Sequence, residues 1–241
     1  MTVPAPLQLP ASVRQHLFAS GAETAQALTA LVAGSLRRGV SERGAGSLIV
    51  SGGRSPTAFF EALSVQALAW EKIVVSLADD RWVAADDADS NENLVRRHLL
   101  RGAAAAARFV PLVDVRVTPE QHLAAAEQAL ATVPHPYDAV LLGVGDDGHT
   151  ASMFPGADAT PAALDVRRPQ RLAAVTPKDA PHRRISLTLR ALLDARLVAI
   201  LIAGEGKRVA IELAARSTSE QHPIAAFLQQ DAVPVHVFFS P

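Results

Sequence analysis

Short apolar runs recur along the chain and are separated by longer segments in which leucine and alanine have helical spacing. A continuous apolar run bounded by turn residues is typical of a buried strand, whereas apolar residues that recur once per helical turn indicate a helix. The runs predict strands over 48–50, 73–77, 109–110, 139–144, 172–175, 197–202 and 235–239. The helical spacing predicts helices over 22–38, 56–68, 90–101, 118–132, 186–193 and 204–216.

The order of these elements, in which strands alternate with helices, predicts the fold class. Parallel strands joined by right-handed helical crossovers form a mostly parallel sheet with helices on its faces. Neither an internal repeat nor a linker interrupts the pattern. We therefore expect an α/β fold with a single domain over residues 1–241.

Polar residues follow four of the predicted strands, either directly or after one alanine. They are SGGRSPT at 51–57, DDR at 79–81, GDDGH at 145–149 and GEGK at 204–207. In an open parallel sheet, ligands bind at the carboxyl ends of the strands. If these ends are aligned, the polar groups converge on one crevice, which is the main argument from the residues alone for an enzyme.

The turn at 51–57 has the character of an anion site. A strand is followed by two glycines, and Pro56 opens the next helix with Ser55 as its expected N-cap, which would point backbone N–H groups at an anion. It is neither a Walker loop nor a dinucleotide fingerprint. An ordinary turn in which the glycines only relieve steric strain fits the local pattern equally well.

Composition and charge exclude several classes of protein. The net charge of −1 and the scattered basic residues give no reason to expect a nucleic-acid partner. The absence of cysteine excludes disulfides, thiolate metal sites and cysteine nucleophiles. No signal-peptide pattern and no apolar run of membrane-spanning length is present, so we expect a cytoplasmic protein.

The motifs together carry a family resemblance that covers nearly the whole chain. SGGRSPTAFFEAL, DDRWVAADDADSNENLVRRHLL, GVGDDGHTASMFPG, PKDAPHRRISLTL and GEGKR follow one another in order, and GVGDDGHTASMFPG is the specific one. The chain resembles the 6-phosphogluconolactonases, which are related to glucosamine-6-phosphate deaminases and more distantly to ribose-5-phosphate isomerases. The resemblance implies a modified Rossmann-like fold of that kind. It also implies hydrolysis of 6-phosphoglucono-1,5-lactone, in the second step of the oxidative pentose phosphate pathway, without metal or organic cofactor.

The resemblance assigns the catalytic candidates. His149 would deprotonate water and later protonate the leaving ring oxygen, because imidazole exchanges protons readily near neutral pH. Asp79 and Arg81 match an Asp-Glu-Arg motif in which Asp80 replaces the glutamate, and Arg81 would neutralise charge near the carbonyl. Asp147 would orient the imidazole or face the sugar hydroxyls.

A second group of candidates would bind the substrate and its 6-phosphate. By resemblance these are Gly52, Gly53, Arg54, Ser55, Asn91, Lys178, Arg184 and Lys207. Arg183 beside Arg184 leaves an ambiguity. We prefer Arg184, because it directly precedes Ile185 and Ser186 and because adjacent side chains on an extended segment point in opposite directions.

Two other functions stay open on the sequence. A sugar-phosphate deaminase or isomerase would share the anion turn and the histidine loop, but the acidic residue that the deaminases carry shortly after their histidine is absent from 152–156. A non-catalytic sugar-phosphate sensor would not need His149, Asp79 and Arg81, all of which are present. A small-molecule sugar-phosphate lactone is thus the expected partner, with neither nucleic acid nor membrane, and a monomer is the expected state.

Overall fold

A seven-stranded sheet forms the centre of the protein, in a computed structural model that describes residues 2–241. The strand order is β1-β10-β9-β6-β2-β3-β5, and every neighbouring pair is parallel. The strands are β1 (Arg14–Leu17), β2 (Gly46–Val50), β3 (Ile73–Leu77), β5 (Arg108–Val110), β6 (Ala139–Leu142), β9 (Val198–Ala203) and β10 (Val235–Ser240). The α/β fold expected from the alternating pattern is therefore confirmed, and only β1 at one edge was not predicted.

A second sheet of three antiparallel strands was not predicted as a sheet, although the strand predicted over 172–175 is confirmed as one of its members. It consists of β4 (Asp79–Arg81), β8 (Arg184–Leu187) and β7 (Leu172–Val175), in the order β4-β8-β7. The helix predicted over 186–193 is correspondingly wrong in its first half. Residues 186–187 belong to β8, and only α6 (Leu189–Leu193), capped by the Thr188 side chain, is helical. Pairing with β4 and β7 on both sides overrides the helical leucine spacing there.

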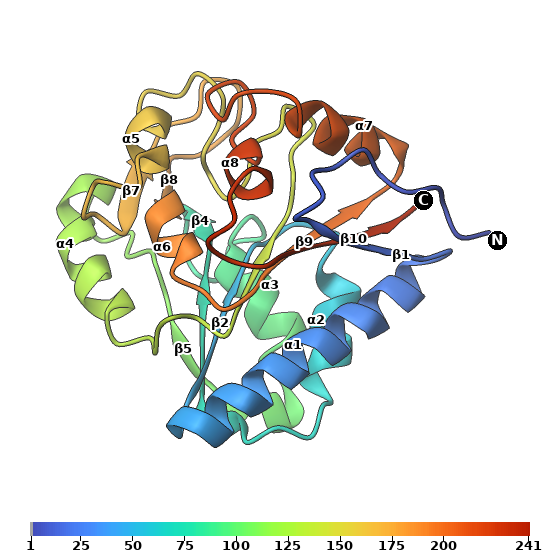
Figure 1. Ribbon diagram of the computed structural model, residues 1–241. Coiled ribbons are helices and arrows are strands. Elements are labelled where there is room, and N and C mark those ends of the chain that lie inside the picture. Colours follow the sequence, from blue (N-terminus) through green and yellow to red (C-terminus); the bar gives the residue numbers. More distant parts are fainter. Residues whose placement is uncertain (1) are drawn as a thin grey trace.

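Helices cover both faces of the large sheet. The long helix α1 (Gly21–Arg43) is capped by Ser20 and ends at Gly44, whose φ of 75° is the left-handed conformation that favours glycine. Figure 1 shows α1 and α2 on one side of the sheet, while α5, α6 and the small sheet lie on the other. The first and last strands bring both ends of the chain to the same edge of the molecule (Figure 1).

The remaining helices are α2 (Thr57–Ser64), α3 (Asn91–His98), α4 (Pro119–Leu130), α5 (Thr160–Leu164), α7 (Glu205–Ala214) and α8 (Ala225–Leu228), with 3₁₀ turns at Trp70–Lys72 and Gly102–Ala106. The predicted cap of α2 is wrong. Pro56 itself occupies the N-cap position with helical dihedrals, and its carbonyl accepts the Phe60 N–H at 2.8 Å, so Ser55 lies one residue too early. None of the helices within residues 2–241 combines the length and apolar character needed to cross a bilayer.

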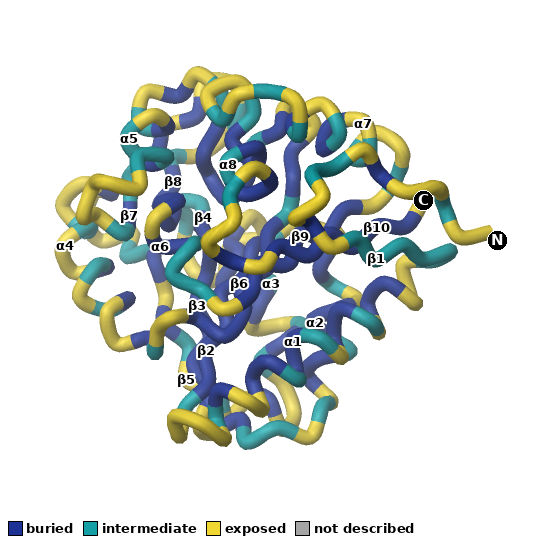
Figure 2. Tube along the Cα trace, viewed as in Figure 1, coloured by how far each residue is buried: buried dark blue, intermediate teal, exposed yellow. Residues whose placement is uncertain are grey.

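One hydrophobic core runs along the central strands. All residues of β2, β3 and β6 are buried, as expected of parallel strands covered on both faces. Figure 2 shows these strands as the dark centre of the molecule, with most exposed positions on loops and outer helix faces. The core therefore fixes the strand ends, and with them the loops that carry the polar residues.

Candidate active site

Most of the predicted site residues meet in one cavity at the carboxyl edge of the large sheet, which we call the carboxyl-end cavity. It has a volume of about 240 Å³ and is bounded by the ends of β2, β6 and β9 together with β4, β8 and the starts of α3 and α7. The predicted residues that line it are Gly52, Gly53, Ser55, Asp79, Arg81, Asn91, His149, Arg184 and Lys207. Strand ends that are far apart in sequence thus converge as the fold class requires.

His149 is held in a tight turn that follows β6. The Gly148 N–H donates to the Gly145 carbonyl at 3.0 Å, and the Gly145 N–H donates to the carbonyl of His149 at 2.8 Å. A Cβ on Gly145 would lie 2.0 Å from His149 Nδ1, and Gly148 has a φ of 77°. Both glycines are therefore required, one for space and one for backbone conformation.

Asp147 fixes the imidazole of His149 from behind. Its Oδ1 lies 2.6 Å from His149 Nδ1 and also accepts the backbone N–H of His149 at 3.1 Å. Partial burial raises the pKa of Asp147, but the hydrogen bonds from His149 outweigh it and hold that pKa at about 2. An ionised acceptor at Nδ1 keeps a proton on that nitrogen, so Nε2 of the neutral ring carries the lone pair. The Phe154 ring packs on the imidazole with centroids 4.2 Å apart.

The small sheet places two arginines side by side. Arg81 on β4 and Arg184 on β8 occupy paired register positions and both line the carboxyl-end cavity. The Nε of each is buried and has no hydrogen-bond partner among residues 2–241. Burial lowers the pKa of Arg184, and the charge of Arg81 acts in the same direction. Two adjacent guanidinium groups with unused donors form a site that favours an anion.

Asp79 is oriented by three neighbours at the bottom of the cavity. It accepts the Ser152 hydroxyl at 2.5 Å, and Arg184 Nη1 lies 3.9 Å from the same carboxylate oxygen. The Asn91 side chain donates to the Asp79 carbonyl at 2.8 Å and occupies the space where a Cβ on Gly52 would fall. Gly52 therefore has to be a glycine for Asn91 to reach the Asp79 backbone.

Asp80 secures the start of α3 instead of entering the cavity. Its carboxylate accepts the backbone N–H groups of Arg81, Asn91 and Glu92 at 2.8, 2.7 and 3.2 Å. Burial raises the pKa of Asp80 to about 6, although these three N–H groups oppose the change. This carboxylate thus holds Asn91 and Arg81 in place at some cost in desolvation.

Three predicted site residues do not line the cavity. Asp147 lies behind the imidazole, and Arg54 and Lys178 are exposed side chains outside the lining. Lys207 lines the cavity but also pairs with Asp146 at 2.8 Å. The geometry separates the neighbouring arginines clearly, because Arg183 pairs with Glu120 on α4 at the surface whereas Arg184 is buried.

Residue-based reasoning missed Asp80, Ser152 and Phe154 as supporting residues. Ser152 and Phe154 lie inside the specific motif at 143–156, so the motif was a signal that could have found them. For Asp80, the sequence indicates only that an aspartate replaces the glutamate of the motif. Within residues 2–241, no group of three or more histidine, aspartate or glutamate side chains could hold a metal ion.

The fold and cavity define an α/β protein with a histidine–aspartate pair and a cavity lined by two arginines at the carboxyl ends of parallel strands. Residues 19–236 match the model of the family described as glucosamine-6-phosphate isomerases/6-phosphogluconolactonase. The chain belongs to this family.

Individual relatives agree with the family match. The chain is 44% identical over 224 residues to a 6-phosphogluconolactonase of Pseudomonas aeruginosa, covering 92% of this chain and 94% of the relative. It is 40% identical over 236 residues to a 6-phosphogluconolactonase of Pseudomonas putida, covering 98% and 96%. The crystal structure of a 6-phosphogluconolactonase from Shewanella baltica superposes with a TM-score of 0.92 at 36% identity, covering 98% of this chain and 100% of that one.

Proposed function

We propose that the protein hydrolyses 6-phospho-D-glucono-1,5-lactone to 6-phospho-D-gluconate, as an enzyme of the oxidative pentose phosphate pathway. The observation that carries the proposal is the His149–Asp147 pair, 2.6 Å apart, at the edge of a cavity that also presents two arginines. The names of the relatives support the same activity.

In the proposed reaction, Nε2 of His149 removes a proton from water while the hydroxide attacks the lactone carbonyl carbon. Asp147 stabilises the imidazolium that forms, because it already accepts the hydrogen bond from Nδ1. When the tetrahedral intermediate collapses, the bond from the carbonyl carbon to the ring oxygen breaks. His149 returns the proton to that oxygen, so the base is regenerated without an external acid.

The cationic groups divide between the reacting carbonyl and the phosphate. Arg81, whose side chain lines the cavity, neutralises the oxyanion, in keeping with preorganised electrostatic stabilisation. Arg184 and the backbone N–H groups of Gly52, Gly53 and Ser55 bind the dianionic 6-phosphate, with Lys207 as a further cation. Asp79, fixed by Ser152, accepts a hydrogen bond from a sugar hydroxyl.

Deaminase chemistry fits the cavity poorly. It needs an additional acidic group near the histidine, and Asp79 is the one carboxylate that lines the cavity within residues 2–241. The positions that follow His149 hold Ser152, bonded to Asp79, and Phe154, packed on the imidazole. Nothing in the site favours the sensor hypothesis either, because the proton-transfer pair is intact. A monomeric state, a cytoplasmic location and the absence of a nucleic-acid partner stay predictions.

The test is the rate of hydrolysis of freshly generated 6-phosphogluconolactone by the purified protein with a chelator, measured against the spontaneous rate. We expect acceleration that the chelator does not reduce and that unphosphorylated gluconolactone does not share. No acceleration over the spontaneous rate would refute the lactonase, and turnover of glucosamine 6-phosphate in its place would establish a deaminase.

A further inference from the structure

A second cavity lies at the opposite edge of the large sheet, where the parallel strands begin, and we call it the amino-end cavity. Its volume is about 380 Å³, which is within the usual range of small-molecule sites. The residues that line it are Arg14, Leu31, Ser35, Arg38, Gly39, Glu42, Arg43, Asp138, Arg196, Leu197, Pro234 and His236. None of these residues takes part in the reaction proposed above.

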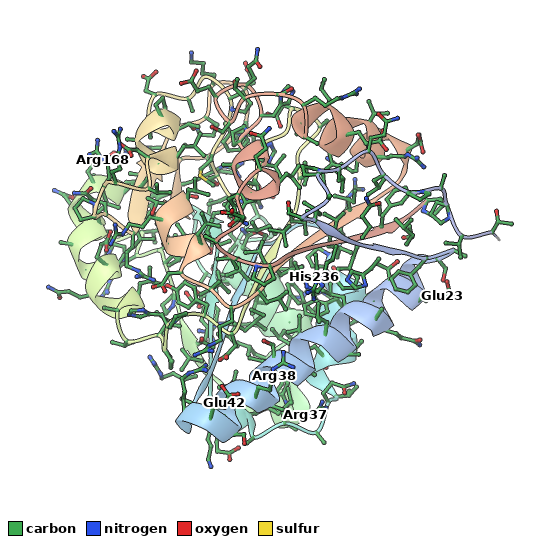
Figure 3. The ribbon with its side chains drawn as sticks, viewed as in Figure 1. Glu23, Arg37, Arg38, Glu42, Arg168 and His236 are labelled. Atoms are coloured by element: carbon green, nitrogen blue, oxygen red, sulfur yellow. The ribbon has the colours of Figure 1, made fainter. Side chains whose placement is uncertain are left out.

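One stripe of α1 supplies a wall of the amino-end cavity. Ser35, Arg38, Gly39, Glu42 and Arg43 follow the spacing that places residues on one helix face. Figure 3 shows Arg38 and Glu42 along α1 with His236 above them on β10, whereas Arg37 projects from the lower side of the same helix. Arg38 and Glu42 are exposed residues of this stripe, and their side chains border the cavity.

The charges around this cavity are unbalanced. Four arginines and two carboxylates line it, and Asp138 is already satisfied by Arg43 at 2.5 Å and by the Ser47 N–H at 2.9 Å. The other three arginines, at positions 14, 38 and 196, make neither an ion pair nor a side-chain hydrogen bond with any part of the chain that the structure describes. The lining therefore has an excess of two positive charges and a set of unused guanidinium donors.

His236 adds a buried polar group to the lining of the cavity. It occupies the register position opposite Arg14 on β1, and its Nδ1 lies 2.9 Å from His16 Nε2. Burial lowers the pKa of His236 to about 4, assisted by the charges of His16 and Arg14, so the ring is neutral at pH 7. The neutral imidazole thus lines the cavity beside Arg14 without adding charge.

We infer that the amino-end cavity is a binding site for a small phosphomonoester, held by Arg14, Arg38 and Arg196. A phosphomonoester carries close to two negative charges near neutral pH, which matches the charge excess of the lining. Its three terminal oxygens accept hydrogen bonds from guanidinium forks in bidentate geometry. The site is independent of the carboxyl-end cavity and of the lactonase proposal, since the two share no lining residue.

Inorganic phosphate is the probe for the test, and the ring resonances of His236 and His149 in the intact protein report on the two cavities separately. With protein labelled at its histidines, we expect phosphate at pH 7.5 to shift the His236 signals along a saturable curve. Arg38→Ala/Arg196→Ala should weaken this binding at least tenfold while the response of His149 is retained. The control is Arg37→Ala/Arg168→Ala, which removes the same charge from exposed positions outside the cavity (Figure 3).

A His236 response that does not saturate, or that weakens equally in both double variants, would overturn the site, because either result means general attraction of anions. A second pair of variants tests the charge argument. Glu42→Gln should tighten phosphate binding about threefold by removing a carboxylate from the lining. Glu23→Gln, at an exposed position of the same helix, should leave it unchanged, and equal effects of the two would contradict the proposed lining.

Discussion

The two cavities at opposite edges of the same sheet differ in how their charged groups are held. In the carboxyl-end cavity, His149, Asp79 and Lys207 each have a carboxylate or hydroxyl partner within 3 Å. In the amino-end cavity, three arginines have no protein partner among residues 2–241. Proton transfer needs a side chain in a fixed orientation, which the hydrogen bonds and the glycines of the His149 turn provide. Attraction of an anion needs mainly positive charge. The comparison predicts that substitutions in the first cavity have sharp, residue-specific effects and that those in the second have graded effects on binding.

Among variants of the carboxyl-end cavity, His149→Ala should have the largest effect on turnover. Loss of the general base and acid should lower kcat for lactone hydrolysis by about 10³-fold or more, with binding of 6-phosphogluconate nearly unchanged. Steady-state kinetics and product titration measure the two quantities. The control is His135→Ala, which breaks a similar histidine–aspartate contact at 2.9 Å outside the cavity. Preserved turnover with lost binding would refute the assignment of the base.

The buried carboxylate of Asp80, next to the carboxyl-end cavity, should make the free energy of unfolding depend on pH. Its pKa is about 6 in the folded protein and about 4 in an unfolded chain, so the folded state binds the proton more tightly. The stabilisation from this proton is complete below pH 4 and is lost as the pH rises through 6, by up to about 3 kcal/mol. Thermal unfolding of the wild type and of Asp80→Asn between pH 4 and pH 7 should show their difference in stability changing over this interval. A constant difference would mean that the three backbone N–H groups keep Asp80 ionised throughout.

Arg184→Ala, compared with Arg183→Ala, tests which of these two adjacent arginines binds the phosphate. Arg184 lines the cavity and Arg183 pairs with Glu120 at the surface, so only the first should bind phosphate. We expect KM for the lactone to rise about 30-fold with a smaller change in kcat, because ground-state binding is lost. Arg183→Ala should leave both constants close to those of the wild type. A selective loss of kcat in Arg184→Ala would place this arginine at the reacting carbonyl.

Asp147→Asn tests whether the hydrogen bond that orients His149 matters more than the negative charge near it. The amide removes the ionised acceptor at His149 Nδ1, so kcat should fall about tenfold with little change in KM. Asp146→Asn removes the same charge from the adjacent position but frees Lys207, so its kcat should be unchanged and its KM equal or lower. Steady-state kinetics of the pair at one pH is sufficient, and equal losses of kcat in both variants would show that only the negative charge matters.

We expect the smallest effect on turnover from substitutions in the amino-end cavity. Arg38→Ala/Arg196→Ala removes two exposed side chains far from the reacting atoms, so turnover in phosphate-free buffer should match the wild type within twofold. Unfolding temperature should also change little, because the side chains of these arginines are exposed and make no ion pair or hydrogen bond within residues 2–241. A large loss of activity without phosphate would show that the two cavities are not independent.

The central strands and their loops could be predicted because their signal is local. Each of β2, β3, β6 and β9 is a short apolar run followed by polar residues, and the parallel arrangement then brings those residues to one edge. The anion turn at 51–57 was ambiguous from local pattern, and the structure places Gly52, Gly53 and Ser55 in the cavity lining. Their roles in binding stay predictions until measured.

Strand β7 of the small sheet was predicted over 172–175, but β4, β8 and β1 could not be predicted, because their signal is not local. β4 is the polar tripeptide DDR and β1 is RQHL, so neither is an apolar run, and each becomes a strand only through a partner distant in sequence. The same long-range pairing aligns Arg81 with Arg184. From the sequence, the choice between Arg183 and Arg184 therefore rested on the family resemblance and on the alternating side-chain directions of an extended segment. In the structure, Arg183 pairs with Glu120 at the surface and Arg184 is buried.

The pairing of β1 with β10 has a consequence for how the chain folds. β1 is an edge strand whose neighbour in the sheet is β10, the last strand, so the segment Arg14–Leu17 has no place to dock until residues near 240 have been synthesised. Contacts between segments so far apart are slow to form, since a long loop must close before they contribute any stability. We therefore expect the strands from the middle of the chain to pair first during translation and this edge to close last.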